Sequence, residues 1–179
     1  MRGACKAVRI ATKDHPWHYT SSGLDHVYLV GIEVATDPES GEEEPLIPRA
    51  RDLHDCLFLA LANKPGALTG SEVRYMRRHL HWTQAQAARK LRVRHAQYFS
   101  YLERKADAPA LTPQVDLLWR LLCLTAFQST GRRKKETLRA IEHLVGQMDK
   151  ALGTTEERKE SIPVELEQRK RDWRMLGAA

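Results

Sequence analysis

Residues 81–104, "HWTQAQAARKLRVRHAQYFSYLER", contain the signals that decide the fold of the central part of the chain. Thr83 and Gln86 have the spacing of a capping box, in which a hydroxyl accepts the N–H of the third helical residue and that residue's side chain reaches back. A helix is therefore predicted to begin after Thr83. Ala87 and Ala88 are expected on its buried side, where their small side chains let another helix cross closely.

A second helix is predicted after the tight connection at residues 92–95, "RVRH". Phe99 and Leu102 are three residues apart, so they share a helical face and are expected to point inward. Tyr98 and Tyr101 fall on other faces. Two short helices joined by about four residues, with small residues at the crossing, are typical of a helix-turn-helix.

Three further helices are predicted around this pair. Residues 51–66 are predicted to form a helix with an apolar face. Asp52 is its expected N-cap, and a Lys-Pro-Gly sequence ends it. Residues 72–80 follow Ser71, a candidate N-cap, and residues 115–127 are strongly apolar. Three leucines of the last helix are predicted to complete the core: Leu118, Leu121 and Leu122.

The segments outside this helical region are predicted to be less regular. Residues 26–34, "HVYLVGIEV", are rich in Val, Ile and Tyr and favour a strand bent at Gly31. Residues 36–45 indicate an acidic turn, and another short strand is expected to start directly after it. Residues 157–179 mix both charge signs and predict a polar tail or a terminal helix.

Positive charge is concentrated in the helical region. The whole chain carries a formal net charge of +6. Residues 71–110 have nine Lys and Arg against three acidic residues, Glu72, Glu103 and Asp107, so this window alone carries +6. Residues 1–70 carry −3 and residues 111–179 carry +3. Such clustering is the electrostatic footprint of a polyanion-binding surface.

Several classes of protein are disfavoured by the sequence. No apolar run reaches the length of a membrane-spanning helix, and no signal peptide is recognisable, so a cytoplasmic, nucleoid-associated protein is expected. The three cysteines are far apart and form no C-x-x-C pair. A surface role is favoured over a metal site for His15, His18 and His26. No nucleophile–base pair is recognisable, so neither an enzyme nor a cofactor or metal is expected.

The helix-turn-helix predicts which residues would contact DNA. In this motif the second helix of the pair enters the major groove. Gln97 can bond adenine through two hydrogen bonds, and Arg94 can reach guanine or a phosphate. The alternative is a plain helical hairpin with solvated arginines. The candidate DNA-contacting residues are Thr83, Gln84, Arg89, Arg92, Arg94, His95, Gln97, Tyr98, Tyr101 and Arg104.

The residues of this motif resemble the lambda-repressor-like (XRE-type) helix-turn-helix. Its pattern runs Ser/Thr-Gln-x-x-x-Ala-x-x-Leu, a turn, and a third helix that ends in an aromatic residue or leucine followed by glutamate. Those places are filled here by Thr83, Gln84, Ala88, Leu91, Leu102 and Glu103. Three more stretches are similar to bacterial regulators of the MqsA-type antitoxin group: "HYTSSGLDHVYLVG" (18–31), "KPGALTGSEVRYMRRHL" (64–80) and "LTPQVDLLWRLL" (111–122). The resemblance covers residues 17–127.

The sequence departs from the family pattern in three respects. Arg92 stands where the family has the glycine of the turn, so a residue with a side chain is expected to adopt a positive φ. One extra residue lies between the two helices. The zinc-binding cysteines of some relatives are missing, so the resemblance implies no zinc here.

An apolar stripe near the C-terminus has the spacing of a coiled-coil seam over two heptads. Its members are Leu138, Ile141, Val145, Met148 and Leu152. The stripe is expected either to dock internally or to form a dimer seam, and the sequence leaves both open.

The predicted fold is mainly α. A five-helix lambda-repressor-like DNA-binding domain (51–127) is preceded by an N-terminal arm and small β segment (1–50), and followed by a C-terminal helical dimerisation segment or tail (131–179). The resemblance implies a sequence-specific regulator, most simply a dimeric repressor on a palindromic operator of double-stranded DNA. It also implies an alternative, an antitoxin that neutralises a cognate toxin protein and autoregulates its operon.

Overall fold

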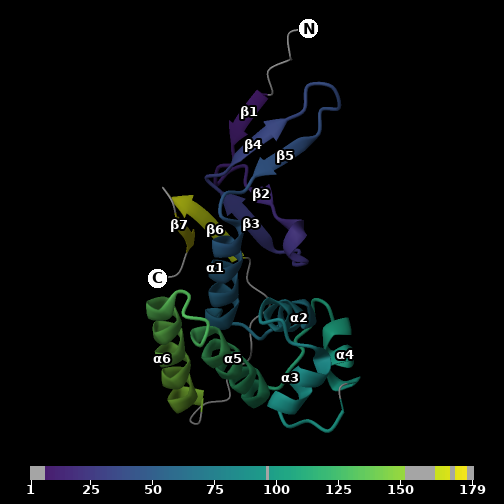
Figure 1. Ribbon diagram of the computed structural model, residues 1–179, viewed down its shortest axis with the longest axis vertical. Helices are drawn as coiled ribbons and strands as arrows, with labels where there is room; N and C mark the ends of the chain where they lie inside the picture. The colour runs from purple at the N-terminus through teal and green to yellow at the C-terminus, as the bar shows by residue number, and fades with distance from the viewer. Residues whose placement is uncertain (1–6, 96, 152–163, 170–171, 177–179) are drawn as a thin grey trace. The chain divides into compact units, whose positions relative to one another are not determined.

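The computed structural model describes residues 7–95, 97–151, 164–169 and 172–176 (Figure 1). The chain folds into two units. Unit 1 contains the residues up to 57 together with those from 163 onward, and unit 2 contains residues 58–162. Helix α1 (Ala50–Asn63) begins in unit 1 and ends in unit 2.

The fold is mixed α/β, so the prediction of a mainly α, five-helix protein is wrong. The described residues contain six α-helices and seven strands in two sheets, and 48% of these residues are helical and 19% are in strands. Part of the difference lies near the C-terminus, where a polar tail or terminal helix was expected and two strands are found. The charges of that segment suggested a solvated tail, but Val164, Leu166 and Trp173 are buried.

Unit 1 contains both sheets. The first sheet is antiparallel, with the order β1-β4-β5. Its strands are β1 (Ala7–Ile10), β4 (Glu33–Thr36) and β5 (Glu43–Leu46). The second sheet has the order β2-β3-β6-β7, and β3 and β6 are parallel. Its strands are β2 (Trp17–His18), β3 (Val27–Val30), β6 (Val164–Arg169) and β7 (Asp172–Met175), and a 3-10 turn (Thr20–Ser22) lies between β2 and β3.

Gly31 separates the two sheets. The predicted single strand at residues 26–34 is instead two strands, β3 and β4, which belong to different sheets. Gly31 has φ +80°, and a Cβ atom there would lie 2.8 Å from the carbonyl oxygen of Gln168. Only glycine tolerates both the positive φ and this close approach. The chain can therefore turn from one sheet into the other at this position.

Unit 2 is helical. Beyond α1 it contains α2 (Gly70–His79), α3 (Gln84–Lys90), α4 (Gln97–Arg104), α5 (Pro113–Gln128) and α6 (Lys134–Ala151). Two N-cap predictions are wrong. Asp52 lies inside the first turn of α1, and the N-cap of α2 is Thr69 rather than Ser71. In both cases the helix begins earlier than the sequence suggested.

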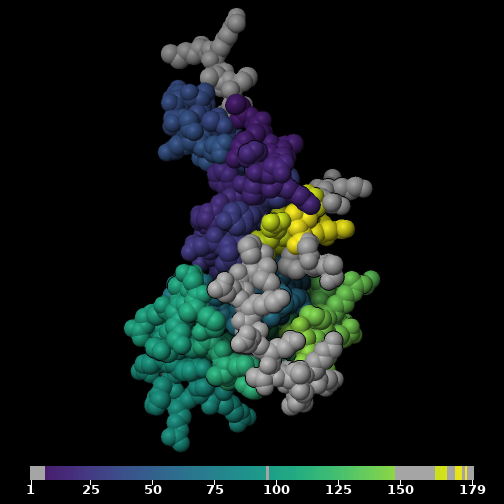
Figure 2. All heavy atoms as spheres, turned by 180° about the vertical axis from the view of Figure 1, so that it is seen from behind, coloured from purple at the N-terminus to yellow at the C-terminus, as the bar shows by residue number. Residues whose placement is uncertain are grey.

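Helices α2, α3 and α4 gather on one flank of unit 2, and the hairpin of α5 and α6 forms the other flank (Figures 1 and 2). The core takes a different face of α5 from the one predicted, because Leu118 is 45% exposed whereas Trp119, Cys123, Leu124 and Phe127 are buried. The side chain of Arg120 holds the end of α1 by donating to the carbonyls of Ala62, Lys64 and Gly66. No helix in the described part of the chain is long and apolar enough to cross a membrane.

Candidate nucleic-acid interface

Helix α3 begins with the predicted capping box. The hydroxyl of Thr83 accepts a hydrogen bond from the backbone N–H of Gln86 at 3.2 Å, and the Gln86 side-chain oxygen accepts from the Thr83 N–H at 2.8 Å. Ala87 and Ala88 are buried, as expected. The pairing satisfies N–H groups that a short helix would otherwise leave without partners. It fixes where α3 starts relative to the turn that precedes it.

The turn between α3 and α4 passes through the left-handed region at Arg92, which has φ +55°. The N–H of Arg92 donates to the carbonyl of Arg89 at 3.1 Å, and the N–H of Val93 donates to the carbonyl of Ala88 at 3.0 Å. This is the geometry that usually selects glycine at the end of a helix. Because Arg92 has a Cβ atom, the conformation costs about 1–2 kcal/mol. The expected positive φ is confirmed.

A buried carboxylate holds α2, α3 and α4 together. Glu103, on α4, is 3% exposed. One oxygen accepts from Nε of Arg77 on α2 at 2.5 Å, and the other accepts from Nη2 of Arg77 at 2.9 Å. The amide nitrogen of Gln84 on α3 donates to the same carboxylate at 3.0 Å. Arg74 adds a bond from Nη2 to the carbonyl of Glu103 at 2.9 Å.

Because of this network, Gln84 does not have the exposed position that a DNA contact would need. The residue is half-buried, and its amide group binds Glu103 rather than pointing outward. Arg77 also donates to the carbonyl of Trp82 at 2.6 Å, which ties the α2–α3 turn to the same group. The charges of Glu103 and Arg77 neutralise each other where solvent is scarce. Gln84 thus helps to position α3 against α4.

A second buried ion pair anchors the start of α2. Nζ of Lys64 lies 2.7 Å from the carboxylate of Glu72, and both side chains are buried. Glu72 also accepts from the backbone N–H of Thr69 at 2.7 Å and completes a capping box. Burial lowers the pKa of Lys64, and the nearby Glu72 carboxylate opposes that shift. The pair therefore stabilises the helix start without adding charge to the surface.

Gly70 lets α2 approach α4 closely. A Cβ atom at this position would lie 2.3 Å from the carbonyl oxygen of Leu102 and 3.1 Å from the backbone nitrogen of Ala106. Both neighbours are backbone atoms, which cannot move aside as a flexible side chain can. The helix crossing that positions α4 therefore depends on the absence of a side chain at Gly70.

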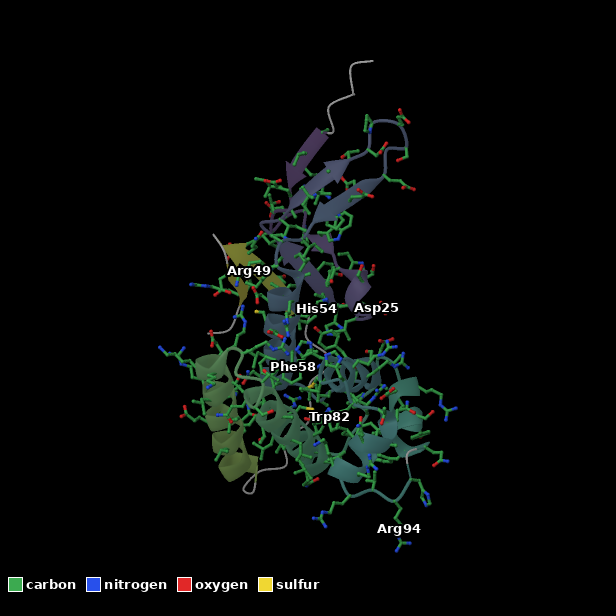
Figure 3. The ribbon with its side chains drawn as sticks, in the orientation of Figure 1. Asp25, Arg49, His54, Phe58, Trp82 and Arg94 are labelled. Carbon is green, nitrogen blue, oxygen red and sulfur yellow. The ribbon has the colours of Figure 1, made fainter. Side chains whose placement is uncertain are left out.

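The exposed charged residues of the helical module, residues 71–110, are almost all cationic. Seven Lys and Arg residues between positions 71 and 110 are exposed: Arg74, Arg78, Arg89, Lys90, Arg92, Arg94 and Arg104. In the same window Glu72 and Glu103 are buried, and Asp107 is the one exposed acidic residue among the positions that the structure describes. Figure 3 shows Arg94 projecting away from the turn between α3 and α4. The buried glutamates remove negative charge from the surface.

The structure places the predicted DNA-contacting residues in two groups. Two of them are half-buried, Gln84 and Tyr98, and burial raises the pKa of Tyr98. The others are exposed: Thr83, Arg89, Arg92, Arg94, His95, Gln97, Tyr101 and Arg104. On α4, Gln97, Tyr101 and Arg104 follow one another at helical spacing and lie opposite the buried Phe99 and Leu102. They form one outward stripe.

The prediction of site residues left out three exposed cations, Arg74, Arg78 and Lys90. Nζ of Lys90 lies 4.5 Å from the centre of the Trp82 ring, a cation–π contact. Lys90 also lines a shallow depression of about 430 Å³, together with Trp82, Gln86 and Arg89. The charge count over residues 71–110 included these cations and was the sequence signal that could have found them.

Over its described residues, the predicted apolar stripe of α6 faces outward. Leu138 and Val145 are each 46% exposed and Ile141 is half-buried, whereas α6 packs on its neighbours through Thr137, Ala140 and Leu144. Leu152 and the side chain of Met148 lie outside the described residues. Internal docking of the stripe is therefore not seen at Leu138 and Val145.

His18, one of the three histidines considered as metal ligands, makes other contacts. Nε2 of His18 lies 2.6 Å from the carbonyl oxygen of Asp25, and the His18 ring stacks on Tyr28. Over the described residues, no three His, Cys, Asp or Glu side chains gather as a metal site would need. These contacts account for His18 without a metal.

Comparison of the chain with protein-family models, with curated proteins and with solved structures finds no match. The case for a function therefore depends on the geometry of the module and on the resemblance in its sequence motif.

Proposed function

We propose that the chain is a sequence-specific DNA-binding regulator that acts from the cytoplasm. One observation carries the proposal: seven exposed cations and one exposed anion lie between residues 71 and 110, on and beside helices that buried networks hold together. Phosphate contacts by Lys and Arg supply much of the affinity for DNA and release counterions. A plain helical hairpin with solvated charge would not need its acidic residues buried.

The stripe on α4 supports groove recognition. Gln97 at the start of the helix and Tyr101 one turn later are exposed, and the core face of α4 lies opposite. A helix presented in this way fits the width of the major groove. In the proposed complex Gln97 reads adenine, Arg94 reaches guanine or phosphate, and the remaining arginines bind the backbone.

Base recognition and backbone binding give different signatures in one experiment. Duplexes enriched by the full chain from a random library would be tested by fluorescence anisotropy at several salt concentrations. Arg94→Ala is expected to weaken binding and to reduce the salt slope by about 0.9 if one phosphate contact is lost. Gln97→Ala is expected to relax the preferred sequence and leave the slope unchanged.

Lys13→Ala is the matched control, because this exposed cation lies in unit 1. It should leave affinity and slope unchanged. The proposal fails if no sequence is enriched, or if Arg94→Ala and Lys13→Ala have the same effect.

A dimer formed through α6 would carry a second recognition helix and could bind a second half-site on the DNA. The exposed Leu138 and Val145 stand one turn either side of Ile141 on that helix. A single helix-turn-helix reads few base pairs, and a two-fold dimer reads half-sites about 34–36 Å apart. Leu138→Lys with Val145→Lys is expected to shift a dimer toward monomer in sedimentation velocity and to weaken binding to a palindrome more than to a half-site. A wild-type chain that is monomeric on and off DNA would contradict this part of the proposal.

The alternative, an antitoxin that neutralises a toxin protein and represses its own operon, shares the DNA-binding step. It differs in requiring a protein-binding surface. The acidic sheet of unit 1 is the observation that favours it, since an acidic surface suits a basic partner. Rescue of growth by this chain when an adjacent reading frame is toxic would support the alternative, and failure of rescue would leave the regulator.

A further inference from the structure

One face of the β1-β4-β5 sheet exposes three apolar side chains beside two glutamates, Glu33 and Glu44. The register aligns Val8 with Ala35 and Ile10 with Glu33, while Glu33 pairs with Leu46 on β5. Val8, Ile10 and Leu46 therefore lie on the same face. Their exposed fractions are 56%, 62% and 53%. A solvated sheet normally presents polar side chains on such a face.

The opposite face of the same sheet is closed by its own side chains. Arg9 donates from Nε and Nη2 to the two carboxylate oxygens of Glu43, each at 2.8 Å. Arg9 is opposite Val34 in the register, and Val34 is fully buried. The contrast between the two faces shows that the sheet can cover apolar side chains. Val8, Ile10 and Leu46, by contrast, are each more than half exposed.

The backbone of β1 also offers hydrogen bonds. β1 is at the edge of the sheet order, and no strand of the described residues pairs with its outer side. The N–H of Ala11 donates to Ile32, and its carbonyl accepts from Gly31, so the polar groups of Ala11 point toward β4. Because an antiparallel ladder alternates, the N–H and C=O groups of Val8 and Ile10 point to the open side. An edge of this kind pairs readily with an added strand.

Charge decides between the occupants that this edge could take. The sheet and its connecting turn, residues 7–10 and 33–46, contain six acidic residues and one basic residue, a net charge of −5. The acidic residues are Glu33, Asp37, Glu39, Glu42, Glu43 and Glu44. The same sheet of a second copy would bring the same charge, and nucleic acid would bring more negative charge. A cationic protein segment is the occupant that electrostatics favours.

We propose that the outer edge of β1 binds an extended, basic segment of another protein by strand addition. Alternate apolar side chains of that segment lie beside Val8 and Ile10, and its main chain bonds their N–H and C=O groups. Its Lys and Arg residues lie at the end beside Ala7, because Ala7 aligns with Thr36 and Thr36 aligns with Glu43 at the acidic turn. The surface belongs to unit 1 and does not depend on DNA binding by unit 2.

The probe is a pair of fluorescent peptides of about ten residues, the length of a long strand. Both alternate Val or Ile with Thr, and they carry three Lys or Arg residues at the N-terminus or at the C-terminus, since the added strand can run in either direction. Anisotropy with the full chain is expected to show binding of one of them that weakens as salt rises. A scrambled peptide of the same composition is expected to bind at least about tenfold more weakly, a loss that measures the alternation.

Two changes separate strand addition from general attraction. Alternate N–H groups of the bound peptide face β1, and the others face away from it. Methylation of the set that faces β1 should abolish binding, and methylation of the other set should leave binding unchanged. Val8→Thr with Ile10→Thr keeps the strand but should weaken binding about tenfold or more, through lost apolar contact. The same double variant should bind enriched DNA as the wild type does. Failure of the peptide-binding proposal can therefore be told apart from failure of the DNA-binding proposal.

Several results would overturn the proposal. They are equal binding of the scrambled peptide, equal effects of both methylation phases, or an unchanged affinity in the double threonine variant. A dimer of the wild-type chain that Ile10→Thr dissociates would also overturn it, since a second copy would then occupy the edge.

Discussion

Glutamate has opposite roles in the helical module of unit 2 and in the three-stranded sheet of unit 1. In the module, Glu72 and Glu103 are buried and bind Lys64 and Arg77. In the sheet, Glu33 and its neighbours on the acidic turn are exposed. The surface of the module therefore has exposed cations, because two of its carboxylates are buried. The sheet has exposed carboxylates beside exposed apolar side chains. The burial of the carboxylates, more than their number, decides whether each surface suits nucleic acid or a basic protein segment.

The largest expected effect comes from removing one buried carboxylate. Glu103→Ala leaves Arg77 and Gln84 without their shared acceptor, and unfolding of unit 2 should become easier by about 3 kcal/mol. Glu43→Ala removes the exposed partner of Arg9 on the sheet and should produce no resolved change, since solvent screens that pair. Amide hydrogen exchange of α2–α4 and of β1–β5 would measure both. Equal effects would contradict the difference between the two regions.

Next in size is the effect of a methyl group at the crossing of α2 and α4. Gly70→Ala places a Cβ atom against the carbonyl of Leu102 and is expected to destabilise the unit by about 1–3 kcal/mol. Gly146→Ala is the matched control, because no atom lies within 4 Å of a Cβ at that position on α6. It should stabilise the helix by about 0.8–1 kcal/mol. Thermal unfolding of both variants tests the sign of each change.

A smaller effect is expected at the turn, where stability and binding should separate. Arg92→Gly relieves the positive φ and is expected to raise the unfolding free energy by about 1 kcal/mol while weakening DNA binding. His81→Gly relieves a similar strain, since His81 has φ +57°. It should give the same gain in stability without the loss of a cation. Equal DNA affinities for the two variants would show that Arg92 does not contact DNA.

The smallest expected effect is the pH dependence that the buried Lys64 adds to the stability of unit 2. Burial lowers the pKa of Lys64 from 10.5, so between the lowered value and 10.5 the unfolded chain holds a proton that the folded chain has lost. The Lys64 contribution to the free energy of unfolding should therefore rise with pH through that window. Lys64→Met with Glu72→Gln removes this dependence. Urea titrations of both proteins at several alkaline pH values measure the difference, and parallel pH profiles would contradict it.

Local signals in the sequence predicted local structure well. The capping box at Thr83, the buried alanines and the positive φ of Arg92 depend on neighbouring residues, and all three are confirmed. The same reading could have found the N-cap of α2, since Thr69 and Glu72 also have capping-box spacing.

Long-range structure was beyond the sequence. The convergence of Arg77, Gln84 and Glu103 requires three helices to meet, and no spacing along the chain encodes that contact. The C-terminal strands were missed for a related reason, although Val164 and Leu166 alternate with glutamates as strand residues do. The partner of β6 is β3, more than a hundred residues earlier in the sequence. A strand whose neighbour is so distant gives little indication of pairing.

The parallel pairing of β3 with β6 has a consequence for synthesis of the chain. Unit 1 is built from both ends of the described sequence, so its second sheet stays unfinished until residues 164–175 have emerged from the ribosome. The helices α2–α5 come earlier, and residues that join them, such as Arg77 and Glu103, are closer in sequence than β3 and β6 are. Contacts between residues closer in sequence form faster. A nascent or proteolytically shortened chain would then carry a finished cationic module before its strand-bearing unit is complete.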